Sequence, residues 1–256
     1  MSVKDLRAKT GAGFLECKKA LDEAAGDLDK AALILKEKGA LKAAKRSDYS
    51  AEEGVVAVSN DNSAIIFLAS ETDFVSKGDH FCEFATEIAN SFASSSSNDV
   101  MEIKSDKISD LKESIINIAA KVGENVSVKQ SAKLEAKAGF KNFSFVHRCI
   151  NDNFSNAGMI GVILQVSENC SDEDAKNLCM HIASSNPTFI STEELTCEWK
   201  EEAEKTANLR DLKISVLEKE AVLEKQTYLL DSSLDVAGFL KKNSIVISKF
   251  YRLSVK

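Results

Sequence analysis

The sequence predicts a fold of the mixed α+β class. Two apolar runs typical of buried strands, at 64–70 and 158–167, are each followed by a segment with helical periodicity. Other helical patterns adjoin strands without the strict strand–helix–strand alternation of a parallel α/β sheet. The order of strand and helix, near 63–92 and again near 159–185, indicates two related halves.

Residues 1–46 predict three short helices. Ser2 can cap the first helix with Asp5 at the capping-box position, and Gly39 is the expected end of the third. These residues hold 11 Lys and Arg against 7 Asp and Glu, or +4, whereas the whole chain carries −7. The asymmetry indicates a separate N-terminal unit with its own partner surface. Its core is expected to include three apolar positions of the second helix: Phe14, Cys17 and Leu21.

The rest of the chain predicts a mixture of strands and helices. A β-hairpin is expected over 54–70 with turn residues at 60–62, and 108–123 has the pattern of an amphipathic helix that stops at its final glycine. The charged segment 196–230 predicts either a projecting helix or a short helical hairpin. Further helices are expected at 79–92, 171–185 and 233–243, and further strands at 125–134, 158–167 and 244–255.

Composition excludes several classes of protein. With 44% hydrophobic and 29% charged residues, the chain resembles an ordinary globular protein. The acidic net charge disfavours a nonspecific nucleic-acid binder. No apolar run approaches the ~20 residues of a membrane span, and the first residues lack the apolar core of a signal peptide. Because both signals are missing, we expect a cytoplasmic protein with no membrane contact, in which the six cysteines, none of them in a CxxC pair, are reduced thiols.

Motifs for catalysis and for nucleotide binding are missing from the sequence. It has no GxxxxGKS or GxxxxGKT phosphate loop and no GxGxxG after a strand. The pairs His147-x-Cys149 and Cys179-x-His181 do not have the spacing of a structural zinc site. No Ser-His-Asp or Cys-His pair can be assigned. The residues therefore give no support for an enzyme, and we expect no cofactor and no metal site.

The segment SETDFVSKGD, residues 70–79, places an acid and a large aromatic side by side directly after a buried strand. One interpretation is structural: Phe74 caps the core of the hairpin and Asp73 is the N-cap of a helix. The other interpretation is functional, with the same two side chains presented to a partner. The residues alone leave both interpretations open.

Four segments, taken in order, resemble the elongation factor Ts family. They are VKDLRAKTGAGFLECKKALDEAAGDLDKAALILKEKGALKAAK at 3–45, ASETDFVSK at 69–77, VGENVSVKQ at 122–130 and MHIASSNPTF at 180–189. Together these matches span most of residues 1–195. Asn156 and Met159 stand where the family often has a histidine and an arginine. The segment 138–153 is longer than usual, and the helical region 196–230 is shorter.

The resemblance implies a particular architecture and function. Residues 1–46 would form a three-helix domain similar to ubiquitin-associated domains. The core would comprise two α/β halves, 47–135 and 136–256, the second carrying a helical projection at about 196–230 and a C-terminal strand. The family acts in protein biosynthesis as the guanine nucleotide exchange factor of elongation factor Tu, a GTPase. It binds no nucleotide itself, which agrees with the missing phosphate loop.

The resemblance also implies which residues contact the GTPase. The TDFV segment, which helps dislodge Mg²⁺ from the bound GDP in this family, corresponds here to Thr72, Asp73, Phe74 and Val75. Further partner contacts are expected at Thr10, Gly11, Ala12, Gly13 and His181. The expected partner is elongation factor Tu in its GDP-bound and nucleotide-free forms. Both one-to-one complexes and dimers occur in the family, so a homo-oligomer is possible.

Two rival functions belong to other classes. The N-terminal helices alone could form a binding module for a peptide or nascent chain, which would leave residues 54–256 unexplained. An RNA-binding translation protein would need a basic face with stacking aromatics. Only 7% of the residues are aromatic and the net charge is acidic, so the sequence disfavours this class.

Overall fold

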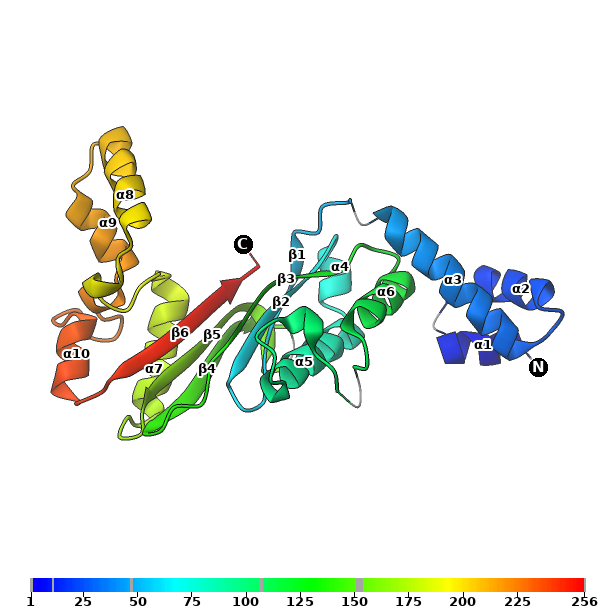
Figure 1. Ribbon diagram of the computed structural model, residues 1–256, viewed down its shortest axis with the longest axis horizontal. Helices are drawn as coiled ribbons and strands as arrows, with labels where there is room; N and C mark the ends of the chain where they lie inside the picture. The colour runs from blue at the N-terminus through cyan, green and yellow to red at the C-terminus, as the bar shows by residue number, and fades with distance from the viewer. Residues whose placement is uncertain (1, 11, 47, 106–107, 151–153, 256) are drawn as a thin grey trace.

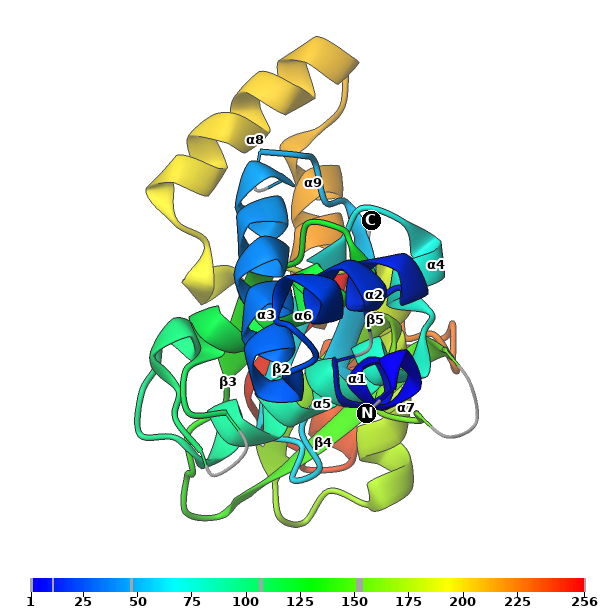
Figure 2. The ribbon, with the colours of Figure 1, turned by 90° about the vertical axis from the view of Figure 1, so that its right-hand side faces the viewer.

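The computed structural model describes residues 2–10, 12–46, 48–105, 108–150 and 154–255. Its helices and strands confirm the α+β class. The N-terminal helices, a sheet covered by helices and a projecting helical hairpin follow one another along the long axis (Figure 1). Viewed along that axis, the N-terminal helices lie in front of the sheet (Figure 2). Among the described residues, no helix combines the length and apolar character needed to cross a membrane.

The N-terminal part consists of three helices that pack on one another: α1 (Val3–Thr10), α2 (Phe14–Glu23) and α3 (Leu28–Arg46). The predicted capping box is confirmed, because the Ser2 N–H donates to the Asp5 carboxylate at 2.9 Å and the Asp5 N–H donates to the Ser2 hydroxyl at 3.3 Å. Phe14 was expected in the core but is 57% exposed. Cys17 and Leu21 lie in the core of these helices as predicted, together with Leu6, Ala20 and Ala31.

Helix α3 does not end at Gly39, as the sequence predicts, but continues to Arg46. Gly39 faces helix α6 (Leu111–Val122), where a side chain would collide with Ala120. The glycine therefore permits two helices to approach closely and does not terminate either of them. Helix α6 ends as predicted at Gly123, whose φ of 76° is the left-handed conformation typical of a helix end.

The six strands within the described ranges form one antiparallel sheet: β1 (Glu53–Val58), β2 (Ala64–Ser70), β3 (Ser127–Lys133), β4 (Phe140–Cys149), β5 (Ala157–Ser167) and β6 (Ile247–Ser254). Their order is β3-β2-β1-β5-β4, and β6 also pairs with β5. The predicted hairpin is confirmed, with Glu53 opposite Ser70 and Val58 opposite Ile65. Strand β4 was not predicted, because this half-exposed edge strand lacks the apolar run of a buried one.

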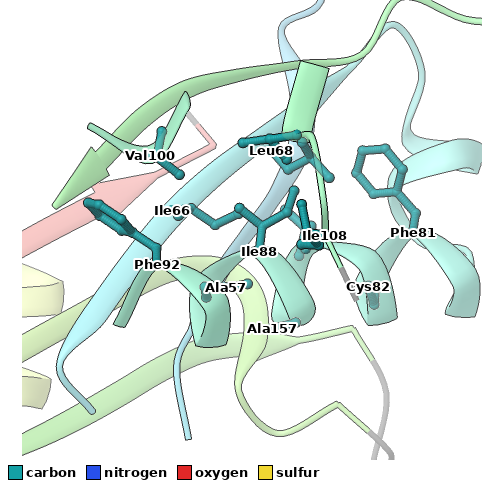
Figure 3. Packing of buried hydrophobic residues seen from close by; sticks show 14 of the residues in the cluster. Ala57, Ile66, Leu68, Phe81, Cys82, Ile88, Phe92, Val100, Ile108 and Ala157 are labelled. Atoms are coloured by element: carbon teal, nitrogen blue, oxygen red, sulfur yellow. The ribbon is translucent and has the colours of Figure 1, made fainter. Parts of the chain in front are cut away.

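The largest core cluster lies between the β1–β2 hairpin and helices α5 (Asp79–Ser94) and α6. Phe81 and Phe92 of α5 lie at its two ends with Ile88 between them (Figure 3). Ile108 belongs to this core although it precedes the first residue of α6. A short 3-10 turn, Val100–Glu102, adds Val100 to the same cluster.

A second core cluster lies between the β4–β5 part of the sheet and helices α7 (Asp172–Ser185) and α10 (Val236–Lys242). The predicted N-cap of α7 is confirmed, because the Ser171 hydroxyl accepts from the Asp174 N–H at 3.0 Å. Residues of β1 that alternate with those facing α5 form a smaller cluster with β2 and β5: Val56, Val58, Ile65 and Ile163.

Within the segment 196–230, two helices form the helical hairpin that the sequence left as one of two alternatives. Helices α8 (Cys197–Arg210) and α9 (Ile214–Ala221) stand away from the sheet (Figure 1). A small core holds them together: Trp199, Ala203, Ala207 and Leu217. Two 3-10 turns, Thr192–Glu194 and Leu223–Lys225, flank the hairpin. The functional division into 1–46, 47–135 and 136–256 stays a prediction.

Candidate functional site at the end of strand β2

A buried strand leads directly to the TDFV segment. Strand β2 is buried along almost its whole length, and a single helical turn, α4 (Asp73–Ser76), begins three residues after its end. Thr72 precedes α4 in an extended conformation and is its N-cap residue. The Ser70 hydroxyl donates to the Thr72 carbonyl at 3.0 Å, which ties the turn to the end of the strand.

Phe74 points into solvent. Its side chain is 88% exposed, while the neighbouring Val75 is half-buried against the core under the hairpin. The structural interpretation of Asp73 and Phe74 is therefore wrong. Phe74 does not cap the core, and Asp73 is the first residue of α4 and not its N-cap. An exposed phenyl ring beside a buried strand leaves apolar surface in water that a partner can cover.

Asp73 is paired with a lysine one helical turn later. The Lys77 ammonium lies 2.7 Å from the Asp73 carboxylate, and both side chains are about half exposed. The hydrogen bond and the charge of Lys77 lower the pKa of Asp73, and the same contact raises the pKa of Lys77. At neutral pH the turn thus presents a charged carboxylate next to an apolar ring.

A salt bridge joins this turn to the N-terminal helices. Arg46, the last residue of α3, donates from Nε and from a terminal nitrogen to the two carboxylate oxygens of Glu71, at 2.9 and 2.6 Å. The Arg46 guanidinium lies 4.9 Å from the centre of the Tyr49 ring. Arg46 lowers the pKa of Glu71, which keeps the pair charged. Helix α3 and the TDFV segment are therefore linked by a bidentate contact.

The turn between α1 and α2 contains the second set of predicted contacts. The Thr10 hydroxyl donates to the Leu6 carbonyl at 2.8 Å and accepts from the Ala12 N–H at 3.3 Å. Gly13 is the exposed N-cap of α2, and Gly11 lies outside the described residues. The next two side chains of α2, Phe14 and Leu15, are 57% and 70% exposed.

His181 does not lie at a surface. Its ring is fully buried, with Nε2 2.9 Å from the Gln226 side-chain oxygen and Nδ1 accepting from the Leu229 N–H at 3.2 Å. Burial lowers the pKa of His181, so the ring is neutral at pH 7. Since no part of the ring reaches solvent, we leave His181 out of the proposed partner contacts.

Within the described ranges, no three His, Cys, Asp or Glu side chains are gathered so that they could hold a metal ion. All six cysteines are free thiols. Of the two cysteines that have a histidine two positions away, Cys149 is exposed and Cys179 is buried.

Comparison with known proteins decides the family. A family model described as elongation factor TS matches residues 71–256, which is well over half of the chain. An elongation factor Ts from Acholeplasma laidlawii is 35% identical over 278 residues, covering 99% of this chain and 90% of the relative. This chain belongs to the elongation factor Ts family. An elongation factor Ts from Clostridium botulinum (strain Alaska E43) is 32% identical, and the match covers 98% of this chain and 90% of the relative. An elongation factor Ts from Mycoplasmoides gallisepticum is 31% identical, and the match covers 99% of this chain and 91% of the relative.

Membership of the elongation factor Ts family assigns the chain a role in translation elongation. The two departures from the family pattern have structural roles in this chain. The Asn156 side-chain amide donates to the Val58 carbonyl at 3.1 Å and to the Asn60 side-chain oxygen at 3.3 Å, joining the residue before β5 to the end of β1 and the hairpin turn. Met159 is partly buried against the cluster that includes Val56.

Sequence reasoning missed the exposed pair Phe14 and Leu15. Leu15 lies two positions before Cys17, which places it about 200° from Cys17 around the axis of a helix with 3.6 residues per turn. That position, on the side opposite the expected core face, was the available signal for Leu15, whereas Phe14 lies near the core face and has no such signal. Sequence reasoning also missed Glu124, whose contacts with the TDFV segment are described below.

Proposed function

We propose that this chain is a guanine nucleotide exchange factor of elongation factor Tu and that it works in the cytoplasm without catalytic chemistry of its own. The observation that carries the proposal is the exposed Phe74 beside the charged Asp73, on a short helix fixed to the end of a buried strand. Membership of the elongation factor Ts family supports the choice of partner.

An exchange factor lowers the affinity of a GTPase for its nucleotide. A nanomolar Kd corresponds to a binding free energy of about −12 kcal/mol, and Mg²⁺ with its surrounding loops supplies much of it. Accelerating GDP release by a factor of ~10⁴ requires lowering the barrier by about 5.5 kcal/mol. The factor therefore binds the nucleotide-free GTPase more tightly than the loaded one, and this coupling is reciprocal.

Phe74 and Asp73 have different roles in this proposal. Burying a phenyl side chain on the partner yields about 1.5–3 kcal/mol, which is available to displace the elements that hold Mg²⁺. The Asp73 carboxylate competes for hydrogen bonds and water near the ion. Thr72 and Val75 hold the turn at its two ends, one through hydrogen bonds and the other through core packing.

The N-terminal helices supply a second contact in this proposal. Residues 1–46 act as a docking unit, and the turn of Thr10, Ala12 and Gly13 meets the GTPase together with Phe14 and Leu15. Two exposed apolar side chains next to the exposed Gly13 support this assignment. The unit is linked to the TDFV segment through Arg46 and Glu71.

The test is the release of a fluorescent GDP analogue from the cognate elongation factor Tu, followed by stopped flow. The wild-type chain is compared with the double variant Asp73→Ala/Phe74→Ala. We expect strong acceleration by the first and little by the second. No acceleration by the wild type would refute the exchange function, and equal acceleration by both would refute the assigned residues.

Two further measurements separate the rival functions. A chain of residues 1–46 that bound elongation factor Tu as tightly as the whole chain would favour a simple binding module. An RNA affinity that falls steeply with salt concentration would favour an RNA-binding protein. We expect neither result.

A further inference from the structure

The two residues before the TDFV helix lie outside the sheet. Strand β2 ends at Ser70, so the backbone N–H groups of Glu71 and Thr72 need acceptors other than neighbouring strands. The carboxylate of Glu124 supplies them. Its Oε2 accepts from the N–H of Glu71 at 3.1 Å and from the N–H of Thr72 at 3.0 Å, and its Oε1 accepts from the Thr72 hydroxyl at 2.6 Å. One charged side chain thus fixes both residues that directly precede Asp73.

The segment that carries Glu124 is held in return by Glu71. The Glu71 Oε1 atom accepts from the N–H of Asn125 at 2.6 Å, so each carboxylate bonds to the backbone of the other segment. The Asn125 side-chain amide donates to the Tyr49 carbonyl at 2.7 Å. Together with the Arg46 contact of Glu71, these bonds join three segments that are distant in sequence: the end of α3, the end of β2 and the turn after α6.

We infer that Glu124 is a positioning residue for Asp73 and Phe74, and that with the Arg46–Glu71 pair it holds their turn at a fixed angle to helix α3. The inference rests on the proposed exchange function. Folding an exposed phenyl ring back onto its own protein lowers the free energy, because the ring leaves water. A mobile turn loses conformational entropy when it enters a partner, and this loss weakens the interaction. Hydrogen bonds that restrain Glu71 and Thr72 in the free protein keep the ring from folding back and reduce the entropy that the turn loses on entering the partner. The restraint therefore acts on the rate of GDP release within the complex more than on the affinity of the first contact.

The first test compares variants of Glu124 in the GDP-release assay at saturating concentrations. We expect Glu124→Ala, which removes all three of its hydrogen bonds to Glu71 and Thr72, to lower the saturating rate by at least about tenfold, the effect of a single charge-assisted hydrogen bond. Glu124→Gln should stay within about threefold of wild type, since its amide can accept from both N–H groups and donate to the Thr72 hydroxyl oxygen. Glu124→Asp keeps the charge but shortens the side chain, and it should resemble the alanine variant.

A matched control is available on helix α6, which precedes Glu124. Glu113 of α6 pairs with a basic residue of α3, Lys36, but it does not contact the turn. Glu113→Ala should therefore leave the saturating rate unchanged. The half-saturating concentration should change little in all of these variants.

A second readout needs no partner. Hydrogen exchange of the Glu71 and Thr72 amides in the free protein should be faster in Glu124→Ala and Glu124→Asp than in wild type or Glu113→Ala. A wild-type saturating rate in Glu124→Ala, a change confined to the half-saturating concentration, or unchanged exchange of these amides would each overturn the inference. If the wild type does not accelerate GDP release, the proposed function fails, and amide exchange alone then decides whether Glu124 restrains the turn.

Discussion

A Cβ atom on Gly39 of helix α3 would lie 2.6 Å from the Cβ of Ala120 and 3.7 Å from the Cα of Ala120 on helix α6. A Cβ contact under 3.0 Å forces a shift of the surrounding atoms. Neither atom belongs to a flexible side-chain end that could rotate away. This approach docks the N-terminal helices against the core, whereas the half-exposed Lys36–Glu113 ion pair on the same two helices contributes little to it.

Replacing Gly39 with alanine should weaken this docking. In an isolated helix the change would be favourable by up to about 1 kcal/mol. Here the added methyl group overpacks the contact, and we expect the free energy of unfolding to fall by about 1–3 kcal/mol in urea denaturation. Ala120→Gly removes the opposing methyl group, so the double variant should be more stable than the sum of the single effects predicts. Strictly additive effects would contradict the contact.

The buried His181 should make stability depend on pH. Its folded-state pKa is lowered by burial, whereas the unfolded chain titrates near the ordinary value of 6.5. Below that pH the unfolded state binds a proton that the folded state does not, so the free energy of unfolding falls as pH decreases. The limit for one proton is about 1.4 kcal/mol per pH unit. Above pH 6.5 the contribution is fully present.

Urea denaturation at a series of pH values, repeated with His181→Gln, checks this prediction. The variant should show a smaller loss of stability below the ordinary histidine pKa. The side chain of His80 is 94% exposed and offers a matched control. In His80→Gln the free energy of unfolding should change with pH as it does in the wild type. Identical slopes in all three proteins would show that His181 does not contribute.

The cysteines should fall into two reactivity classes. Cys149 and Cys197 are exposed, whereas the other four are buried. Burial raises the pKa of Cys82 and Cys170 to about 11 and raises the pKa of Cys179 as well, which suppresses their reactive thiolate forms. A thiol reagent should modify two groups quickly in the native protein and all six after unfolding. Cys149→Ser/Cys197→Ser should abolish the fast phase, and a fast phase of more than two thiols would contradict the assignment.

Features that depend on neighbouring residues were predictable from the sequence. The capping box of Ser2 and Asp5, the N-cap Ser171 and the left-handed Gly123 each act within one helical turn. The β1–β2 hairpin follows from two apolar runs and the polar turn between them. In each case the residues that decide the structure lie within a few positions of one another.

Features that depend on distant residues were not predictable. The role of Gly39 is decided by Ala120 on another helix, and the hydrogen bonds of Thr72 are decided by Glu124, which is 52 residues away. Strand β4 is recognisable only beside β5, since its own residues are half exposed. The same limit applies to Phe74: the pattern around it fits both a core residue and a presented one.

Phe74 and Phe81 allow the presented ring to be compared with a packed one. Phe81 is 2% exposed in the core under the hairpin, and Phe81→Ala should lower the free energy of unfolding by about 3–5 kcal/mol. Phe74→Ala should change it by less than about 0.5 kcal/mol, because the ring contacts mainly water. Both values are measured by urea denaturation without a partner. A loss above about 1 kcal/mol for Phe74→Ala would mean that the ring packs on its own protein in solution. A ring packed in that way would not be free to enter a GTPase, and the role proposed for Phe74 would have to be abandoned.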